Sequence, residues 1–191
     1  MAKLKVDQFV DLLKKSGLVD DVRLTEALSG VDLSVNDSGI IASTLTKKGL
    51  LTEWQSEKLL QGRHKGFYLG KYKLLNHIGT GGMGAVYLAE HMVMRHRVAI
   101  KLLPTNLSAH TAYLERFHQE ARASAQLNHP NMVRAFDVDQ EDNLHYLVME
   151  FVDGTDLQVL VSRQGPLDYH IAADYTRQAA LGLGYAHRVG L

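Results

Sequence analysis

The first third of the chain alternates between short amphipathic stretches and turn residues. Phe9, Leu12 and Leu13 recur at helical spacing, and Ile41 and Leu45 repeat that spacing further along. Residues typical of helix ends separate the stretches: Gly17, Asn36 to Ser38, Gly49 and Gly62. The pattern therefore predicts four short helices within residues 1–62.

The last of these stretches has the clearest start signal. Thr52 followed by Gln55 predicts a capping box, and Trp54 at helical spacing with Lys58 fits a core anchor better than a ligand platform. Because nothing in residues 1–62 has a catalytic pattern, we interpret them as a helical accessory or docking domain. The polar, basic residues that follow predict a linker at 63–69.

Beyond residue 70 the period changes from helical to extended. Apolar positions alternate on both sides of a glycine cluster at 79–84, again from Arg97 to Leu103, and in the pair Met132 to Val138 and Leu144 to Met149. A helix is predicted between them at 112–127, and another at 171–187. The expected fold class is α+β: a small all-α domain, then a five-stranded antiparallel sheet with one helix, then further helices.

Composition narrows the function without fixing it. The 191 residues, 46% of them hydrophobic, suffice for two small domains with cores. The 21 basic side chains balance the 21 acidic ones, so nucleic acid is not an expected partner. The absence of cysteine, of metal-ligand spacing and of a long apolar run predicts a cytoplasmic chain with no metal site and no membrane segment.

The glycine cluster and a nearby lysine suggest a phosphate clamp. Gly79, Gly81 and Gly84 let a turn bring its N–H groups close to phosphate oxygens, and Lys101 in V-A-I-K supplies a positive charge. A dinucleotide fingerprint would need a helix after the glycines, and a Walker loop would need Lys and Ser or Thr directly after them; Ala85 and Val86 stand there instead. The interpretation is a strand–turn–strand lid.

A buried lysine needs an anionic partner. Glu120 lies on the predicted helix with Phe117, Ser124 and Leu127 on one face, so its carboxylate points toward the lysine strand. Taken alone, Glu120 fits an ordinary surface charge better than an ion-pair partner. Its position between Lys101 and the H-P-N turn at 129–131 favours the ion pair.

This order of motifs resembles the N-terminal part of bacterial eukaryotic-type (Hanks-type) Ser/Thr protein kinases. The resemblance covers residues 70–191 and rests on several motifs in sequence: the glycine hairpin, V-A-I-K, the helix with Glu120, H-P-N and a hinge at 149–154. It implies a kinase small lobe at 70–149 and, at 150–191, the hinge and the first helices of an incomplete large lobe.

The resemblance also assigns roles to particular residues. Lys101 and Glu120 become the catalytic ion pair, Met149 the gatekeeper, and the backbones of Glu150 and Val152 the contacts to adenine. Asp156 matches a ribose ligand, but it equally fits a helix N-cap before Leu157. The full set expected to bind ATP is Gly79, Gly81, Gly84, Val86, Ala99, Lys101, Met149, Glu150, Val152 and Asp156.

The family's catalytic loop and D-F-G segment do not occur in these residues. Val189 follows His187 and Arg188 where the catalytic aspartate would be required. We therefore expect these residues alone to be inactive, the Mg²⁺ ligands to lie beyond Leu191, and a longer parent to transfer the γ-phosphate of ATP to protein Ser/Thr hydroxyls. The alternative is a pseudokinase or scaffold that uses the helical domain to bind an unknown protein partner.

Overall fold

The computed structural model describes residues 4–29, 37–81, 84–103 and 111–191, with the side chain of residue 111 excepted. Two predicted features fall partly outside this range: Asn36 of a helix start, and Gly82 and Met83 within the glycine cluster. The chain forms two compact units. The first comprises residues 1–79 and 87–96, and the second comprises residues 80–86 and 97–191.

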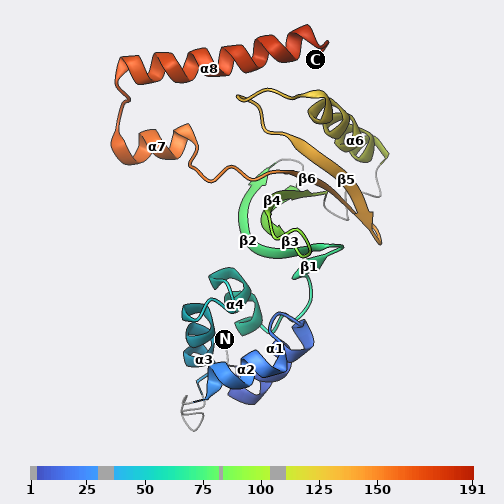
Figure 1. Cartoon of the computed structure of the whole chain (residues 1–191), viewed down its shortest axis with the longest axis vertical. Coiled ribbons are helices and arrows are strands. Elements are labelled where there is room, and N and C mark those ends of the chain that lie inside the picture. The colour runs from blue at the N-terminus through green and yellow to red at the C-terminus, as the bar shows by residue number, and fades with distance from the viewer. Residues whose placement is uncertain (1–3, 30–36, 82–83, 104–110) are drawn as a thin grey trace. The chain divides into compact units, whose positions relative to one another are not determined.

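Four helices make up the N-terminal part of the first unit (Figure 1). They are α1 (Val6–Ser16), α2 (Asp21–Leu28), α3 (Ser38–Lys47) and α4 (Glu53–Leu60). Gly17 ends α1 with φ 65°, a left-handed conformation that favours glycine. Asp20, Asp37 and Thr52 cap the other three helices through their side chains. The four predicted helices are thus confirmed.

The apolar faces of these helices form one core. Its central side chains are almost fully buried, and Trp54 packs at its edge. The buried members are Val6, Phe9, Leu13, Leu18, Val19, Leu24, Ala27, Ile41, Ala42, Leu45, Leu51, Leu59 and Phe67. Phe67 comes from the segment predicted as a linker and is only 2% exposed, so the chain after α4 stays attached to the helical core.

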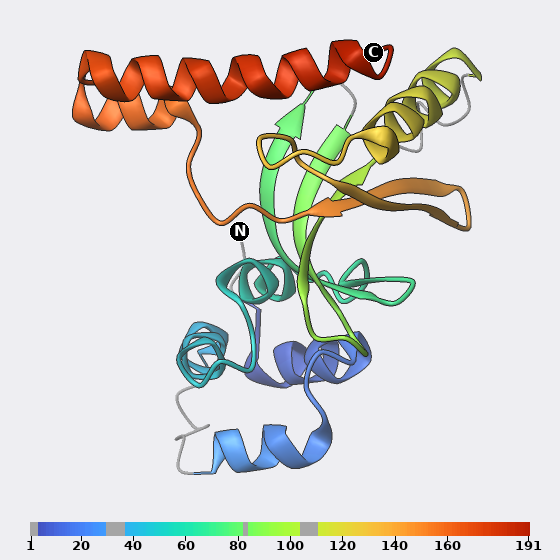
Figure 2. The ribbon, with the colours of Figure 1, turned by 45° about the horizontal axis from the view of Figure 1, so that its top comes forward.

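The strands are hydrogen-bonded in the order β1-β2-β3-β4-β6-β5. Their bounds are β1 (Tyr68–Leu69), β2 (Tyr72–Gly81), β3 (Gly84–His91), β4 (Arg97–Leu102), β5 (Ala135–Glu141) and β6 (Leu144–Glu150). β1 pairs antiparallel with β2, and β6 pairs antiparallel with both β4 and β5. Figure 2 shows β2 and β3 as long, curved strands.

The sheet differs from the prediction in two details. It has six strands rather than five, because two residues after the helical segment pair with β2 as β1. The strand before β6 is also displaced from its predicted bounds, since β5 runs from Ala135 to Glu141 rather than from Met132 to Val138. Asp142, with φ 53°, makes the tight reversal.

In the described residues of the second unit, three helices accompany the strands. They are α6 (Thr111–Gln126), α7 (Leu157–Gln164) and α8 (Tyr169–Arg188). α6 lies beside the β5–β6 hairpin in both views (Figures 1 and 2). The α+β fold class is therefore confirmed. None of the helices in the described part of the chain is long and apolar enough to cross a bilayer.

Candidate active site

Lys101 and Glu120 form an ion pair between β4 and α6. The Nζ of Lys101 lies 3.0 Å from Oε2 of Glu120. The lysine side chain is 22% exposed and the glutamate side chain 43% exposed. Because partly exposed pairs contribute only about 0–1 kcal/mol to stability, the pair is more significant for where it holds the ammonium group. The predicted pairing is present, and its catalytic role stays a prediction.

Apolar packing on both sides of the pair explains why the two side chains meet. Phe117 and Ala121 on α6 are each 1% exposed and pack with Leu103 and Leu147. Ala121 follows Glu120 directly, so burial of the helix face brings the carboxylate close to Lys101 on β4. Lys101 is opposite Leu147 in the β4–β6 register, which fixes the lysine on the same part of the sheet.

The glycine cluster joins two strands. β2 ends at Gly81 and β3 begins at Gly84, which has φ 137°. A strand therefore stands on each side of the cluster, as predicted, whereas a dinucleotide site would have a helix after it. An added Cβ on Gly79 or Gly81 would meet no described atom within 4 Å. Packing among the residues that the structure describes therefore gives no reason for glycine at these two positions.

Two of the predicted nucleotide residues are cross-strand neighbours. Ala99 on β4 is paired with Met149 on β6, and Ala99 is 5% exposed. Met149 is partly buried against the apolar cluster of Leu103, Phe117, Ala121 and Leu147. Glu150, the next residue, donates its backbone N–H to the Arg134 carbonyl at 2.9 Å. The start of the hinge is thereby held by its neighbouring chain segment.

The remaining hinge residues are more open. Val152 is 61% exposed. The carboxylate of Asp156 accepts a hydrogen bond from the Val159 N–H at 2.7 Å and caps α7. The N-cap interpretation of Asp156 is thus confirmed, while its contact with ribose stays a prediction.

Comparison with known proteins decides the family. Residues 72–191 match the protein kinase domain. The chain belongs to the protein kinase family. It is 37% identical over 119 residues to the serine/threonine-protein kinase PrkC of Bacillus subtilis, covering 62% of this chain and 18% of PrkC. It is 39% identical over 127 residues to the serine/threonine-protein kinase PknA of Mycobacterium tuberculosis, covering 64% of this chain and 30% of PknA.

Solved structures agree with the sequence matches. The kinase domain of Mycobacterium tuberculosis PknI aligns with a TM-score of 0.55 and 29% identity. That alignment covers 66% of this chain and 52% of the PknI chain. This chain thus spans less than a third of the two named relatives and about half of the solved domain. The resemblance to bacterial Hanks-type kinases is confirmed.

The H-P-N turn at 129–131 is held by α8, a contact that the sequence did not reveal. The His129 ring stacks on the Tyr185 ring with centroids 5.3 Å apart. The side-chain amide of Asn131 donates to Gln178 Oε1 at 3.1 Å. Gly182 is buried nearby, where an added Cβ would lie 3.1 Å from the Asn131 carbonyl oxygen.

A histidine pair joins α6 to β6, and its member on α6 lies two residues before Glu120 in the sequence. The rings of His118 and His145 meet edge to face, with centroids 5.6 Å apart. Burial and the neighbouring His118 lower the pKa of His145. Protonation of this histidine therefore opposes the folded arrangement. The sequence alone offered no signal for the pair, because its members lie on different elements.

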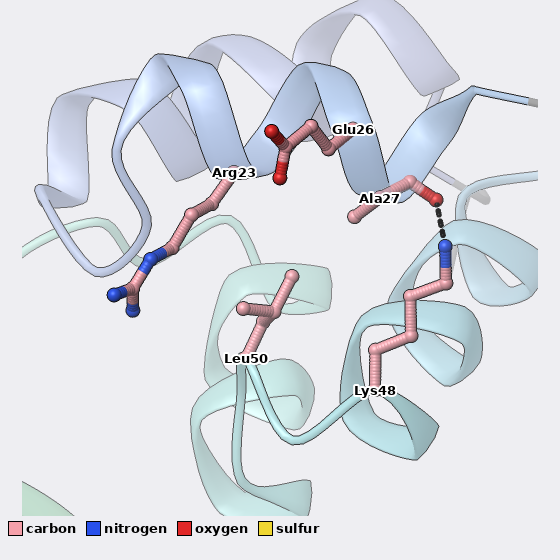
Figure 3. A pocket seen from close by; sticks show the side chains of 5 residues that line it. All are labelled: Arg23, Glu26, Ala27, Lys48 and Leu50. Atoms are coloured by element: carbon pink, nitrogen blue, oxygen red, sulfur yellow. Dashed lines mark hydrogen bonds between the residues drawn. The ribbon is translucent and has the colours of Figure 1, made fainter.

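A hollow of about 380 Å³ occurs in the helical segment, away from these kinase motifs in the sequence (Figure 3). Arg23, Glu26 and Ala27 of α2 line it with Lys48 and Leu50. Lys48 donates from Nζ to the Ala27 carbonyl at 2.7 Å, so its ammonium group already stabilises the end of α2. None of the predicted site residues lies here. Among the described residues, no group of three or more potential ligands could hold a metal ion.

Proposed function

We propose that this chain is the ATP-binding N-terminal portion of a Ser/Thr protein kinase. Its parent would transfer the γ-phosphate of ATP to Ser or Thr hydroxyls of proteins. The observation that carries the proposal is the Lys101–Glu120 contact of 3.0 Å within a chain of the protein kinase family. A scaffold without nucleotide binding would not need this pair, so the pair favours the enzyme over the pseudokinase alternative.

Each part of the site has a distinct task in this proposal. Lys101 binds the α- and β-phosphates, and Glu120 holds its ammonium group in place. The backbone N–H groups of the glycine turn bind phosphate oxygens, and the open space at Gly79 and Gly81 supports this close approach. Val86, Ala99 and Met149 surround the adenine, while the backbones of Glu150 and Val152 bind its edge. Asp156 binds the ribose.

The described residues do not fit a magnesium site, because no group of three or more acidic or histidine side chains that could hold a metal ion is present among them. When bound, Mg²⁺ would neutralise negative charge on the phosphates. We assign its ligands, and the base for the substrate hydroxyl, to segments outside this chain. These residues alone are therefore proposed to bind ATP without transferring phosphate.

The remaining assignments follow the same proposal. We propose that residues 1–62 form the helical accessory domain with 63–69 as its connection, that 70–149 form the small lobe, and that 150–191 begin the large lobe. Protein substrates and one protein partner of the helices are the proposed partners, with no role for nucleic acid. The cytoplasm, where ATP is abundant, is the proposed location.

Titration calorimetry of ATP into the 191-residue chain tests the proposal. Lys101→Met should weaken ATP binding about tenfold or more, since a charge-assisted contact is lost with little change in volume. Lys47→Met, at an exposed position at the end of α3, is the matched control and should bind as the wild type does. Absence of ATP binding by the wild-type chain, or equal affinity in Lys101→Met, would overturn the proposal.

A further inference from the structure

A buried glutamine ties α4 to the strand that leads into the glycine turn. Gln55 is 1% exposed. Its Nε2 donates to the Leu74 carbonyl of β2 at 2.7 Å, and its Oε1 accepts from the Thr52 N–H at 3.0 Å. Both the donor and the acceptor of this side-chain amide are thus hydrogen-bonded. A directional bond from a buried side chain to a strand carbonyl fixes the position of that strand more closely than apolar contact does.

Thr52 adds a second bond of the same kind. Its hydroxyl donates to the Leu75 carbonyl at 2.5 Å while it also caps α4. The β1–β2 register ends at the pairs Tyr68 with Lys73 and Leu69 with Tyr72. The hydrogen bonds from α4 and its N-cap therefore reach β2 directly after the two residues that are paired with β1.

Aromatic rings extend the contact to the second strand of the hairpin. The Trp54 ring meets Tyr87 of β3 edge to face, with centroids 5.6 Å apart, and Tyr87 in turn meets His77 of β2 at 5.2 Å. Trp54 also packs on Phe67 at 5.8 Å. Tyr87 and His77 lie on the two strands close to the glycine cluster. One tryptophan thus contacts both the helical core and the strand that leaves the turn.

Side chains of β1 and β2 also donate two hydrogen bonds to the helical segment. The Tyr68 hydroxyl donates to the Gly17 carbonyl at 2.8 Å, and Lys73 Nζ donates to the Leu18 carbonyl at 3.1 Å. Burial raises the pKa of Tyr68 and lowers the pKa of Lys73, as expected for polar groups that are held away from water. Four polar contacts therefore join the helices to β1 and β2.

We propose that residues 1–62 act as a brace that sets the geometry of the ATP-binding hairpin, with Gln55 and Trp54 as positioning residues. The helices would then help to position the ATP-binding strands, and would not serve only as a protein-docking domain. This inference rests on the proposed function for its link to ATP. The mechanical part, support of β2 and β3 by α4, can be measured without nucleotide.

Hydrogen exchange of the whole chain tests the mechanical part. Gln55→Met keeps the volume but removes the donor to Leu74, so amides of residues 74–91 should exchange about tenfold faster, while β6 keeps its rate. Gln61→Met, at an exposed position at the end of α4, is the control and should change neither. An unchanged rate at 74–91, or an equal acceleration that includes β6, would overturn the brace.

Nucleotide binding tests the link to function. ATP affinity should fall about threefold or more in Gln55→Met, because the hairpin is less preorganised, and remain unchanged in Gln61→Met. ATP should also shift the emission of Trp54, the single tryptophan of the chain. If ATP binds without an emission shift and with equal affinity for the wild type and Gln55→Met, the link to function is overturned. If the wild type binds no ATP, the proposed function is overturned, and the hydrogen-exchange rates then decide whether the brace exists.

A milder variant covers the case in which Gln55→Met does not fold. Tyr68→Phe removes only the hydroxyl that bonds to Gly17. It should accelerate exchange at residues 68–74 about twofold and leave β6 unchanged. Identical exchange in Tyr68→Phe and in the wild type would then count against the brace.

Discussion

Gly182 of α8 lies against the main chain of the H-P-N turn, where an added Cβ would be 3.1 Å from the carbonyl oxygen of Asn131. Gly184, on the same helix, would bring a Cβ no closer than 3.8 Å to the flexible side chain of Arg188. The two glycines therefore face different surroundings although their helical context is shared.

This difference predicts opposite effects of alanine. Gly184→Ala should stabilise the chain by about 0.5–1 kcal/mol, since alanine favours a helix and meets no obstacle. Gly182→Ala should destabilise it by about 1 kcal/mol, because crowding against a backbone oxygen outweighs the same gain. Urea unfolding followed by circular dichroism measures both. Equal stabilisation by the two variants would contradict the packing described for α8.

The His118–His145 pair predicts acid sensitivity. The pKa of His145 is lowered in the folded chain, so the unfolded chain binds more protons once the pH falls below about 6.5. Stability is then present above that pH and is lost as the pH falls toward the folded pKa. The melting temperature of the wild type should therefore drop between pH 7.5 and pH 5.5.

His145→Gln removes the titrating ring and should flatten that pH profile. His187→Gln, at an exposed position near the end of α8, is the matched control and should keep the wild-type slope. Thermal melts at a series of pH values give the comparison. If His145→Gln kept the full acid sensitivity, the pair would not be its source.

Substitution of Asp156 can separate its role as the N-cap of α7 from its proposed role in ribose binding. Asp156→Ala removes the N-cap of α7 and should cost about 1 kcal/mol, whereas Asp156→Ser retains a capping oxygen and should cost little. If the carboxylate also binds the ribose, both variants should lose ATP affinity to a similar extent. Calorimetric titration alongside unfolding separates the roles. Wild-type affinity in Asp156→Ser would limit Asp156 to capping.

The sequence predicted those features that depend on local order. The capping box of Thr52 and Gln55 and the face of α6 that carries Glu120 follow from spacing within one helix. The glycine turn could be assigned to a hairpin because β-favouring residues stand on both sides of it. These predictions needed no knowledge of a distant partner.

Long-range partners and very short elements escaped prediction. The Gln55 side chain satisfies the local capping pattern, and nothing in that pattern shows that its amide also reaches Leu74. β1 has two residues, too few for alternation to be visible. Phe67 stands among polar residues that suggested a linker, yet it is buried with the helices because its partners lie earlier in the chain.

A double-mutant cycle on ATP affinity tests the central claim most directly. If Glu120 acts by holding the Lys101 ammonium group, Glu120→Gln should weaken ATP binding several-fold in the wild type. In the Lys101→Met background the same change should have no further effect, because there is no ammonium group left to hold. Calorimetry of the four chains measures this. Equal losses caused by Glu120→Gln in both backgrounds would contradict the account.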